Sequence, residues 1–419
     1  MAWARGVPSL LGYDVWGTRV HVVGSGHSFS EILLGEHYFI AGRQASYQGD
    51  LPLVRDVDTS LLRSGVDASH LVDLAACAHL SELNGALAAR QQAFINLGGA
   101  TYQTLTGAIL TGTHGSGRDL GMLGDAVRAI LVVSASGHLV QLEPTGGLSD
   151  PVKFAARYGE ARTLVQENGL FDAFLVSLGC MGIAVRMVVE VLPAYLLREE
   201  RALTRWSVLR EELRQGRHLD ARHCEVLINP YATRRGDHTC LLTTRNMAAP
   251  GDTPNQEPEW RTATQWFASR HPVQEVLTWF LNTFPQTIPG LLDETLKQLV
   301  TKEPYIDTSY LVYDLERVND ITALSSEIAY PLDGNVYLDA VDSLLAVIKS
   351  NAQNGRHHTA PLALRFVAPS QALLSMFYDR RTCMVEFPLP VGTQHLEGIW
   401  CLPIPMGRSR SLAIKKLSK

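Results

Sequence analysis

Residues 107–118 read GAILTGTHGSGR, and the interpretation of the whole chain starts from this stretch. Seven of its residues are Gly, Ser or Thr, so a well-packed regular element is not expected over its length. Backbone N–H groups and short hydroxyls in such a segment can wrap closely around a large polar ligand. The alternative interpretation is a long structural loop.

A second glycine-rich segment, VVGSGHSFS at residues 22–30, lies upstream and follows a predicted strand. Gly24 and Gly26 carry no side chains, so consecutive backbone N–H groups can approach an anion closely. No third glycine opens a helix and no lysine follows, which excludes the dinucleotide-binding fingerprint and the Walker loop. Taken alone, the segment also fits an ordinary turn, with His27 as a surface or capping residue.

A third segment, SLGCMGIAV, occupies residues 177–185. A helix is predicted to end at Gly179, and Gly182 is expected to let a strand begin close to a neighbouring group. The alternative is a helix C-cap followed by a turn. Together, in this order, the three segments are far more specific than any one of them.

The composition restricts the class of protein. The chain has 419 residues, a formal net charge of −5 and six scattered cysteines, with 46% hydrophobic and 19% charged residues. This charge argues against a nucleic-acid binder, and the cysteine spacing against a zinc site or a disulfide framework. No apolar run reaches the ~18 residues of a membrane-spanning helix, and the N-terminus lacks the order of a signal peptide. We therefore expect no transmembrane segment, no metal and a reduced, cytoplasmic location.

Apolar β-branched runs predict buried strands, and periodic segments between them predict helices. In the first half, strands are predicted at Thr18–Gly24, Leu71–Ala75, Ala129–Val133 and Ile183–Leu192, and helices at Leu80–Gln91, Asp150–Asn168 and Gly169–Leu178. Beyond Pro193, helices are predicted at Arg198–Arg217, Trp260–Val300 (broken at Pro285 and Pro289) and Val336–Ser350, a loop at Asn246–Glu259, and strands at Cys224–Pro230, Thr239–Thr244, Thr308–Tyr313, Ser326–Pro331, Ala363–Val367 and Cys383–Pro388.

The three glycine-rich segments, in this order, resemble those of the vanillyl-alcohol-oxidase-type flavoproteins, which carry a PCMH-type FAD-binding domain. Within them the chain is most similar to the alditol, gulonolactone and arabinonolactone oxidases. The resemblance implies an α+β fold: a PCMH-type domain of two subdomains at residues 1–194, then a cap domain at 195–395 with a mixed or antiparallel sheet flanked by helices. Residues 396–419 remain as an atypical basic tail.

The same resemblance implies the cofactor and the residues that hold it. FAD would bind through its pyrophosphate at the first segment, and His27 would bond covalently to the flavin. The second segment would contact the flavin, with Ser116 near the isoalloxazine, and the third would lie near the adenine-ribose end. The implied FAD-binding residues are Val23, Gly24, Ser25, Gly26, His27, Ser28, Gly112, Thr113, His114, Gly115, Ser116, Gly117, Ser177, Gly179, Gly182 and Ile183.

In the second half, LALRF at residues 362–366 resembles the segment that places a Glu-x-Arg pair above the flavin in the sugar oxidases. Arg365 matches the arginine, which would hold a substrate oxygen. Ala363 stands where the relatives have Glu, and Glu386 is a candidate to face the same site. Glu386 could equally pair with Arg380 or Arg381.

The resemblance implies oxidation of a CH–OH group in a small alcohol, polyol or sugar lactone, by hydride transfer to flavin N5. Arg365, Glu386 and Ser116 are the catalytic candidates, and His114 is an alternative base to Glu386. O2 is the expected acceptor, giving H2O2. A dehydrogenase with another acceptor is one alternative, and an impaired flavin-binding remnant is another. The remnant is motivated by a short N-terminus and by the absence of the family's C-terminal His-Trp-Gly-Lys segment. The FAD subunits of molybdenum hydroxylases and the enolpyruvyl-sugar reductases fit the second half less well.

Overall fold

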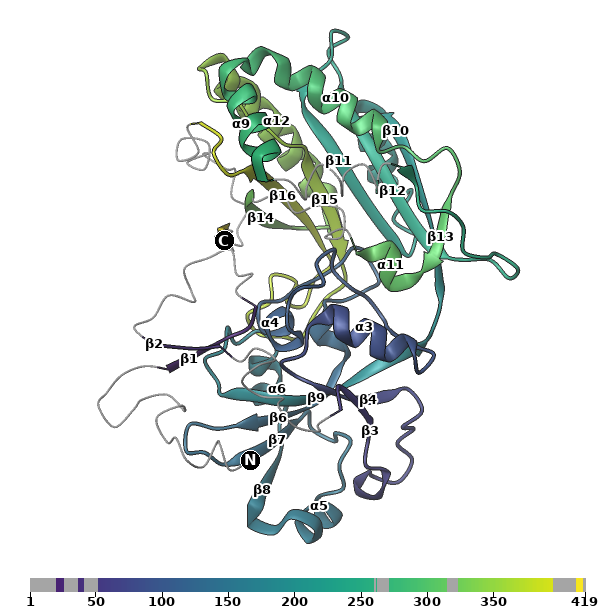
Figure 1. Ribbon diagram of the computed structural model, residues 1–419, viewed down its shortest axis with the longest axis vertical. Coiled ribbons are helices and arrows are strands. Elements are labelled where there is room, and N and C mark those ends of the chain that lie inside the picture. Colours follow the sequence, from purple (N-terminus) through teal and green to yellow (C-terminus); the bar gives the residue numbers. More distant parts are fainter. Residues whose placement is uncertain are drawn as a thin grey trace. The chain divides into compact units, whose positions relative to one another are not determined.

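The computed structural model describes residues 20–25, 37–40, 52–259, 261, 271–314, 323–394 and 412–416. The chain divides into two compact units (Figure 1). The first unit comprises residues 1–114, 121–195 and 370–378, and the second comprises 115–120, 196–369 and 379–419. Each unit thus contains a short segment from the half of the chain that forms the other. None of the helices in the described residues is long and apolar enough to cross a membrane.

The first unit contains two sheets. The small one pairs β1 (Val20–Val23) in parallel with β2 (His37–Ile40). The larger one runs in the order β3-β4-β9-β6-β7-β8, with β5 paired to β9. Its strands are β3 (Val54–Asp56), β4 (Leu71–Ala75), β5 (Gln92–Phe94), β6 (Val127–Val133), β7 (Leu139–Glu143), β8 (Arg162–Gln166) and β9 (Ile183–Pro193). The predicted strand over residues 71–75 is confirmed residue for residue.

Apolar runs along the central strands explain why this sheet forms. Leu74, Ile130, Met187 and Val189 are fully buried, and β4 is buried along its whole length. The helices of the unit are α3 (Leu80–Ala88), α4 (Leu105–Leu110), α5 (Pro151–Tyr158) and α6 (Asn168–Phe174). Leu80, Leu105 and Ile109 from α3 and α4 are also fully buried. The core of the unit therefore includes residues of both strands and helices.

The predicted helix over residues 150–168 is wrong in its second half. Asp150 caps α5 through hydrogen bonds to the N–H groups of Val152 and Lys153. The helix ends at Gly159, whose φ of +49° favours glycine. Residues 162–166 then form β8, parallel to β7. The sequence of β8 contains polar residues and no apolar run, so it was not predicted as a strand. An edge strand can be polar because only part of its surface is buried.

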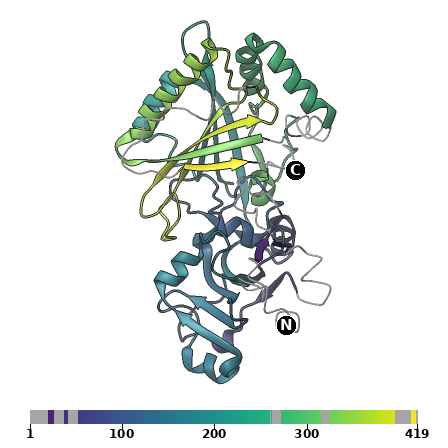
Figure 2. The same cartoon turned by 90° about the vertical axis from the view of Figure 1, so that its left-hand side faces the viewer.

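The second unit is built on one eight-stranded sheet in the order β13-β10-β12-β11-β15-β16-β14-β17. The strands are β10 (Leu196–Arg205), β11 (His223–Ala232), β12 (His238–Met247), β13 (Tyr305–Thr308), β14 (Ala323–Pro331), β15 (Leu362–Val367), β16 (Thr382–Pro390) and β17 (Leu412–Lys416). All of their pairings are antiparallel. In Figure 2, β16, β14 and β17 lie side by side at one end of this order.

Helices cover one face of this sheet. They are α7 (Trp206–Arg214), α9 (His271–Thr283), α10 (Ile288–Gln298) and α12 (Val336–Gln353). Their apolar residues form a core with Cys224, Val226 and Ile228 of β11 and with Leu362, Leu364 and Phe366 of β15. The alternate residues of these strands therefore point to the opposite face.

Three predictions for this half need correction. Residues 198–217, predicted as a charged helix, form β10 and then α7. Residues 308–313, predicted as a strand, form the end of β13 and the short helix α11 (Ser309–Tyr313). Part of the predicted tail, residues 412–416, is a strand paired with β14. The charges of β10 suggested a solvated helix, whereas the chain pairs several of them inside the protein.

Candidate active site

In the first unit, parts of the three glycine-rich segments meet around the short helix α4. Thr104 caps this helix, since its hydroxyl accepts a hydrogen bond from the N–H of Gly107 at 3.1 Å. Gly24, from the first segment, lies against the same hydroxyl: a Cβ on Gly24 would be 2.5 Å from Thr104 Oγ1. At the other end of α4, the N–H of Leu178 donates to the carbonyl of Leu110 at 3.1 Å.

The second segment leaves α4 through a turn that requires glycine. Gly112 has a φ of +69°, and its N–H donates to the carbonyl of Ile109 at 3.1 Å. The N–H of Thr113 donates to the carbonyl of Ala108 at 2.9 Å. His114 is buried, and its ring contacts the edge of Phe377 with 4.9 Å between centroids. Thr113 and His114 are therefore held in place before any ligand binds.

The third segment follows α6 and leads into β9. The predicted helix end at Gly179 is wrong, because α6 ends at Phe174 and Leu175 is its C-cap. Leu178 and Gly179 have positive φ in the turn between α6 and β9. Gly182 approaches β6 so closely that a Cβ would lie 2.8 Å from the carbonyl oxygen of Val133. Ile183 then pairs with Val133 as β9 begins.

These segments have the features that an FAD site needs. Ser177 Oγ is buried and has no hydrogen-bond partner in the structure, although buried hydroxyls normally have one. Gly24 allows the first segment to pack directly against Thr104, beside the second segment. The residues present therefore fit a bound FAD, which would be held by Val23–Ser25, Gly112–His114 and Ser177–Ile183. Gly26, His27 and Ser28 lie outside the described residues.

Ser116 and Gly117 belong to the second unit and have structural contacts there. Ser116 is buried, and its hydroxyl donates to the carbonyl of Cys224 and accepts from the N–H of Phe366 at 3.3 Å. The N–H of Gly117 donates to the carbonyl of Phe366 at 2.6 Å. A Cβ on Gly117 would lie 2.3 Å from the carbonyl oxygen of Arg222, so no larger residue fits. These contacts attach the end of the second segment to β11 and β15, and the predicted catalytic role of Ser116 stays a prediction.

Arg365 lies on β15, on the sheet face away from the helices. Its cross-strand neighbour on β11 is Glu225, and Arg365 Nε donates to Glu225 Oε1 at 3.1 Å. Arg365 Nη1 lies 3.2 Å from Glu386 Oε2 and 3.9 Å from Glu327 Oε1. Burial would lower the pKa of Arg365, but Glu386, Glu225 and Glu327 outweigh it and raise the pKa. The side chain nevertheless remains 28% exposed, so it can also contact a ligand.

Glu386 is the cross-strand neighbour of Ala363. Ala363 itself is buried. Glu386 pairs with Arg365, and Ser325 Oγ donates to its other oxygen at 2.7 Å. A carboxylate is therefore present beside Arg365, although it comes from the neighbouring strand.

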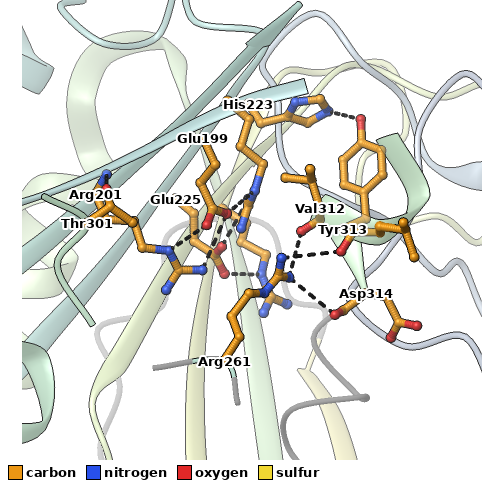
Figure 3. Close-up of polar contacts among 12 residues, drawn as sticks. Glu199, Arg201, His223, Glu225, Arg261, Thr301, Val312, Tyr313 and Asp314 are labelled. Atoms are coloured by element: carbon orange, nitrogen blue, oxygen red, sulfur yellow. Dashed lines mark hydrogen bonds and ion pairs between the residues drawn. The ribbon is translucent and has the colours of Figure 1, made fainter. Parts of the chain in front are cut away.

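The ion pairs continue across the sheet from Arg365 (Figure 3). Glu225 Oε2 lies 3.4 Å from Arg245 Nη1, and Arg245 Nε donates to Glu199 Oε2 at 2.7 Å. Arg201 Nε donates to Glu199 Oε1 at 3.0 Å. Burial alone would raise the pKa of Glu199, but Arg201, Arg245 and Arg261 hold it at about 2. Glu199 is fully buried, yet it stays ionised because of these three arginines.

Two further contacts in Figure 3 fix the segment around α11 over this face. Arg261 is fully buried, and its guanidinium donates to the carbonyls of Val312 at 3.0 Å and Asp314 at 3.3 Å. These carbonyls lie at the C-terminal end of α11, where a cation is favoured. The hydroxyl of Tyr313 lies 2.6 Å from Nε2 of His223. Burial is the main cause that lowers the pKa of His223 well below its usual value, and the positive charges of Arg245 and Arg222 lower it further. The ring is therefore neutral.

Sequence reasoning missed two parts of this arrangement. Glu225 was included only as part of a strand motif, although a carboxylate within an otherwise apolar strand indicates a buried charged partner. The segment 96–101, NLGGAT, also packs against the second glycine-rich segment. A Cβ on Gly98 would lie 3.2 Å from Thr113 Cγ2 and 3.3 Å from the carbonyl oxygen of His114. Its two adjacent glycines were the available signal.

Comparison with known families and structures agrees with this geometry. Residues 16–143 match the family described as FAD binding domain, and residues 187–393 match D-arabinono-1,4-lactone oxidase. L-gulono-1,4-lactone dehydrogenase of Mycobacterium tuberculosis is 25% identical over 375 residues, which cover 88% of this chain and 74% of the relative. D-arabinono-1,4-lactone oxidase of Debaryomyces hansenii is 23% identical, covering 83% of this chain and 58% of the relative.

Among solved structures, cholesterol oxidase from B. sterolicum has a similar fold. The TM-score is 0.65 at 11% identity, and the match covers 90% of this chain and 73% of that one. This likeness supports the α+β fold with a PCMH-type FAD-binding domain. With its FAD-binding match followed by an oxidase match, the chain is an FAD-dependent oxidoreductase that is similar to the D-arabinono-1,4-lactone oxidases.

Proposed function

We propose that this protein oxidises the CH–OH group of a sugar 1,4-lactone, and that Arg365 and Glu386 are its catalytic residues. The main support for this proposal is the arrangement of side chains around Arg365. Its guanidinium is held by Glu225 and Glu386 and still keeps exposed surface. This region lies within residues 187–393, which match the lactone oxidases. The relatives named as acting on gulono- or arabinonolactone suggest the substrate class.

Each residue has a distinct task in this proposal. Bound FAD supplies the acceptor for the hydride that leaves the alcohol carbon. Arg365 binds the substrate oxygen and stabilises the negative charge that develops there. Glu386 accepts the hydroxyl proton, so the substrate loses two electrons and two protons in total and becomes a carbonyl compound. Glu225 keeps the guanidinium in place and so acts as a positioning residue.

Anaerobic mixing with a panel of lactones and polyols tests the proposal. We expect L-gulono- or D-arabinono-1,4-lactone to bleach the visible flavin absorbance. Arg365→Lys should slow the bleaching by ~10²-fold or more, because the lysine cannot reproduce the forked hydrogen bonds. Arg381→Gln is the matched control, since Arg381 is half exposed and pairs with Asp119. Retained flavin that no lactone or polyol reduces would refute the proposal and favour a flavin-binding remnant.

The electron acceptor and the flavin linkage complete the proposal. We propose O2 as acceptor, with H2O2 as product, and His27 as the covalent attachment of FAD. Oxygen consumption with stoichiometric H2O2 supports an oxidase, whereas turnover only with an added dye supports a dehydrogenase. Acid precipitation should leave the flavin in the pellet, and His27→Ala should release it into the supernatant. Flavin in the supernatant of the unmodified protein would refute the covalent bond.

A further inference from the structure

A pocket of about 330 Å³ lies on the larger sheet of the first unit. Side chains from β3, β4, β6, β7, β8 and β9 and from the end of α5 line it. Asp73 of β4 is part of the lining, whereas its chain neighbours Val72 and Leu74 are completely buried. The lining thus belongs to the opposite face of this strand, and no residue of the three glycine-rich segments takes part in it.

Four arginines line the pocket, and their charges are only partly balanced. They are Arg55, Arg157, Arg162 and Arg186. Asp73 balances two of them, with Oδ2 at 2.6 Å from Arg55 Nη2 and Oδ1 at 2.7 Å from Arg186 Nε. In the described part of the chain, no carboxylate lies within ion-pair distance of Arg157 or Arg162.

The other two carboxylates of the lining have partners elsewhere. Asp56 pairs with Arg90, which is not part of the pocket. Asp58 accepts hydrogen bonds from the N–H and the hydroxyl of Ser60 and caps a short helical turn. Neither one neutralises Arg157 or Arg162.

Arg162 is held in a position that favours an incoming anion. Its guanidinium carbon lies 4.1 Å from the centre of the Tyr158 ring, and that of Arg157 lies 5.8 Å from the same ring. Arg162 Nε is buried and has no hydrogen-bond partner in the structure. A buried donor without an acceptor costs free energy, which a bound oxyanion would recover.

We infer that this pocket is a second ligand site, which binds a small organic anion through its carboxylate or phosphate group. Arg162 and Arg157 supply the forked donors that suit either group. The volume is at the lower end of small-molecule sites, which suits a sugar acid or a sugar phosphate. The site is separate from the residues proposed to hold FAD and from those around Arg365.

Isothermal titration of the FAD-loaded full chain tests the inference, with inorganic phosphate and gluconate as separate probes at matched chloride concentration. We expect saturable binding of at least one probe. Arg162→Gln and Arg157→Gln should each weaken it by ~10-fold or more, because each removes a charged donor. Arg128→Gln is the matched control: Arg128 is in the same unit and pairs with Glu190, but does not line the pocket.

Each outcome decides the question. Binding of gluconate alone supports a carboxylate ligand, and binding of phosphate alone supports a phosphate ester. No saturation by either probe up to ~10 mM would overturn the inference. Equal affinity in Arg157→Gln, Arg162→Gln and Arg128→Gln would also overturn it. Flavin content and circular dichroism report whether each variant folds, and the exposed Arg157 keeps the test valid if Arg162→Gln is unstable.

Discussion

Replacing Glu199 by glutamine should destabilise the second unit strongly. Glu199 is fully buried between Arg201 and Arg245. Glu199→Gln keeps the size and one acceptor oxygen but removes the charge. Two buried guanidinium groups then lose their shared counter-charge.

The magnitude follows from the pKa of Glu199. Its value of about 2, against an ordinary 4.5, corresponds to about 3 kcal/mol of stabilisation at neutral pH. Removal of one partner of a buried ion pair typically costs ~3–5 kcal/mol. Because the folded-state pKa is lowered, this stabilisation is present above pH 4.5 and is lost as the pH falls toward 2. The difference in unfolding free energy between Glu199→Gln and the unmodified protein should therefore become smaller as the pH is lowered.

Urea unfolding followed by tryptophan emission measures this loss, since Trp206 and Trp279 lie in the second unit. Glu200→Gln is the matched control: Glu200 is the next residue on β10, is mostly exposed and pairs with Arg198. The control should lose less than ~1 kcal/mol. Similar losses for Glu199→Gln and Glu200→Gln would refute the reasoning that the buried network carries stability.

Three other changes test separate parts of the structure. Ser116→Ala removes a hydroxyl that hydrogen-bonds two backbone groups of the second unit, so the free energy of unfolding in urea titrations should fall by ~1–3 kcal/mol. Unchanged stability together with slower flavin reduction would instead indicate a chemical role for the hydroxyl. Gly24→Ala places a Cβ 2.5 Å from Thr104 Oγ1, so the flavin-to-protein ratio of the purified variant should fall. The double variant Gly24→Ala/Thr104→Ala should regain part of this ratio. A double variant with a ratio as low as that of Gly24→Ala would contradict the steric explanation. Burial lowers the pKa of His358 from 6.5 to about 3, so the folded protein loses stability as the pH falls below 6.5, by about 2 kcal/mol at pH 5. His358→Leu should remove this loss, which urea titrations at pH 8 and pH 5 measure. His138→Leu is the control: His138 is exposed, and its replacement should leave the loss unchanged.

Local patterns predicted the buried strands well but not the charged or edge strands. Residues 71–75 are apolar except for Asp73 and are buried along their whole length, so composition alone identified them. Residues 196–205 contain Glu199 and Arg201, whose partner Arg245 lies on another strand. Burial of these charges depends on strand pairing, which no local pattern reveals. β17 was missed for a similar reason, since its pairing with β14 spans a long stretch of sequence.

The candidate site divides in the same way. The glycine-rich segments were identified because bare backbone is itself a sequence signal, and Arg365 because of its surrounding strand motif. Glu225 faces Arg365 only because β11 and β15 pair, although the two residues are 140 positions apart in the sequence. The position of Glu386 opposite Ala363 likewise follows from strand register. The sequence therefore indicated the chemical groups, and the fold determined which of them meet.

The segment exchange between the units also constrains the order of events during synthesis. The first unit includes residues 370–378, where Phe377 contacts His114 and Ser370 Oγ donates to Asp125 at 2.6 Å. A nascent chain that has emerged only to residue 195 lacks both partners. The first unit can complete its packing only after most of the second has left the ribosome. A stop codon near residue 195 would consequently yield a fragment that lacks both of these contacts.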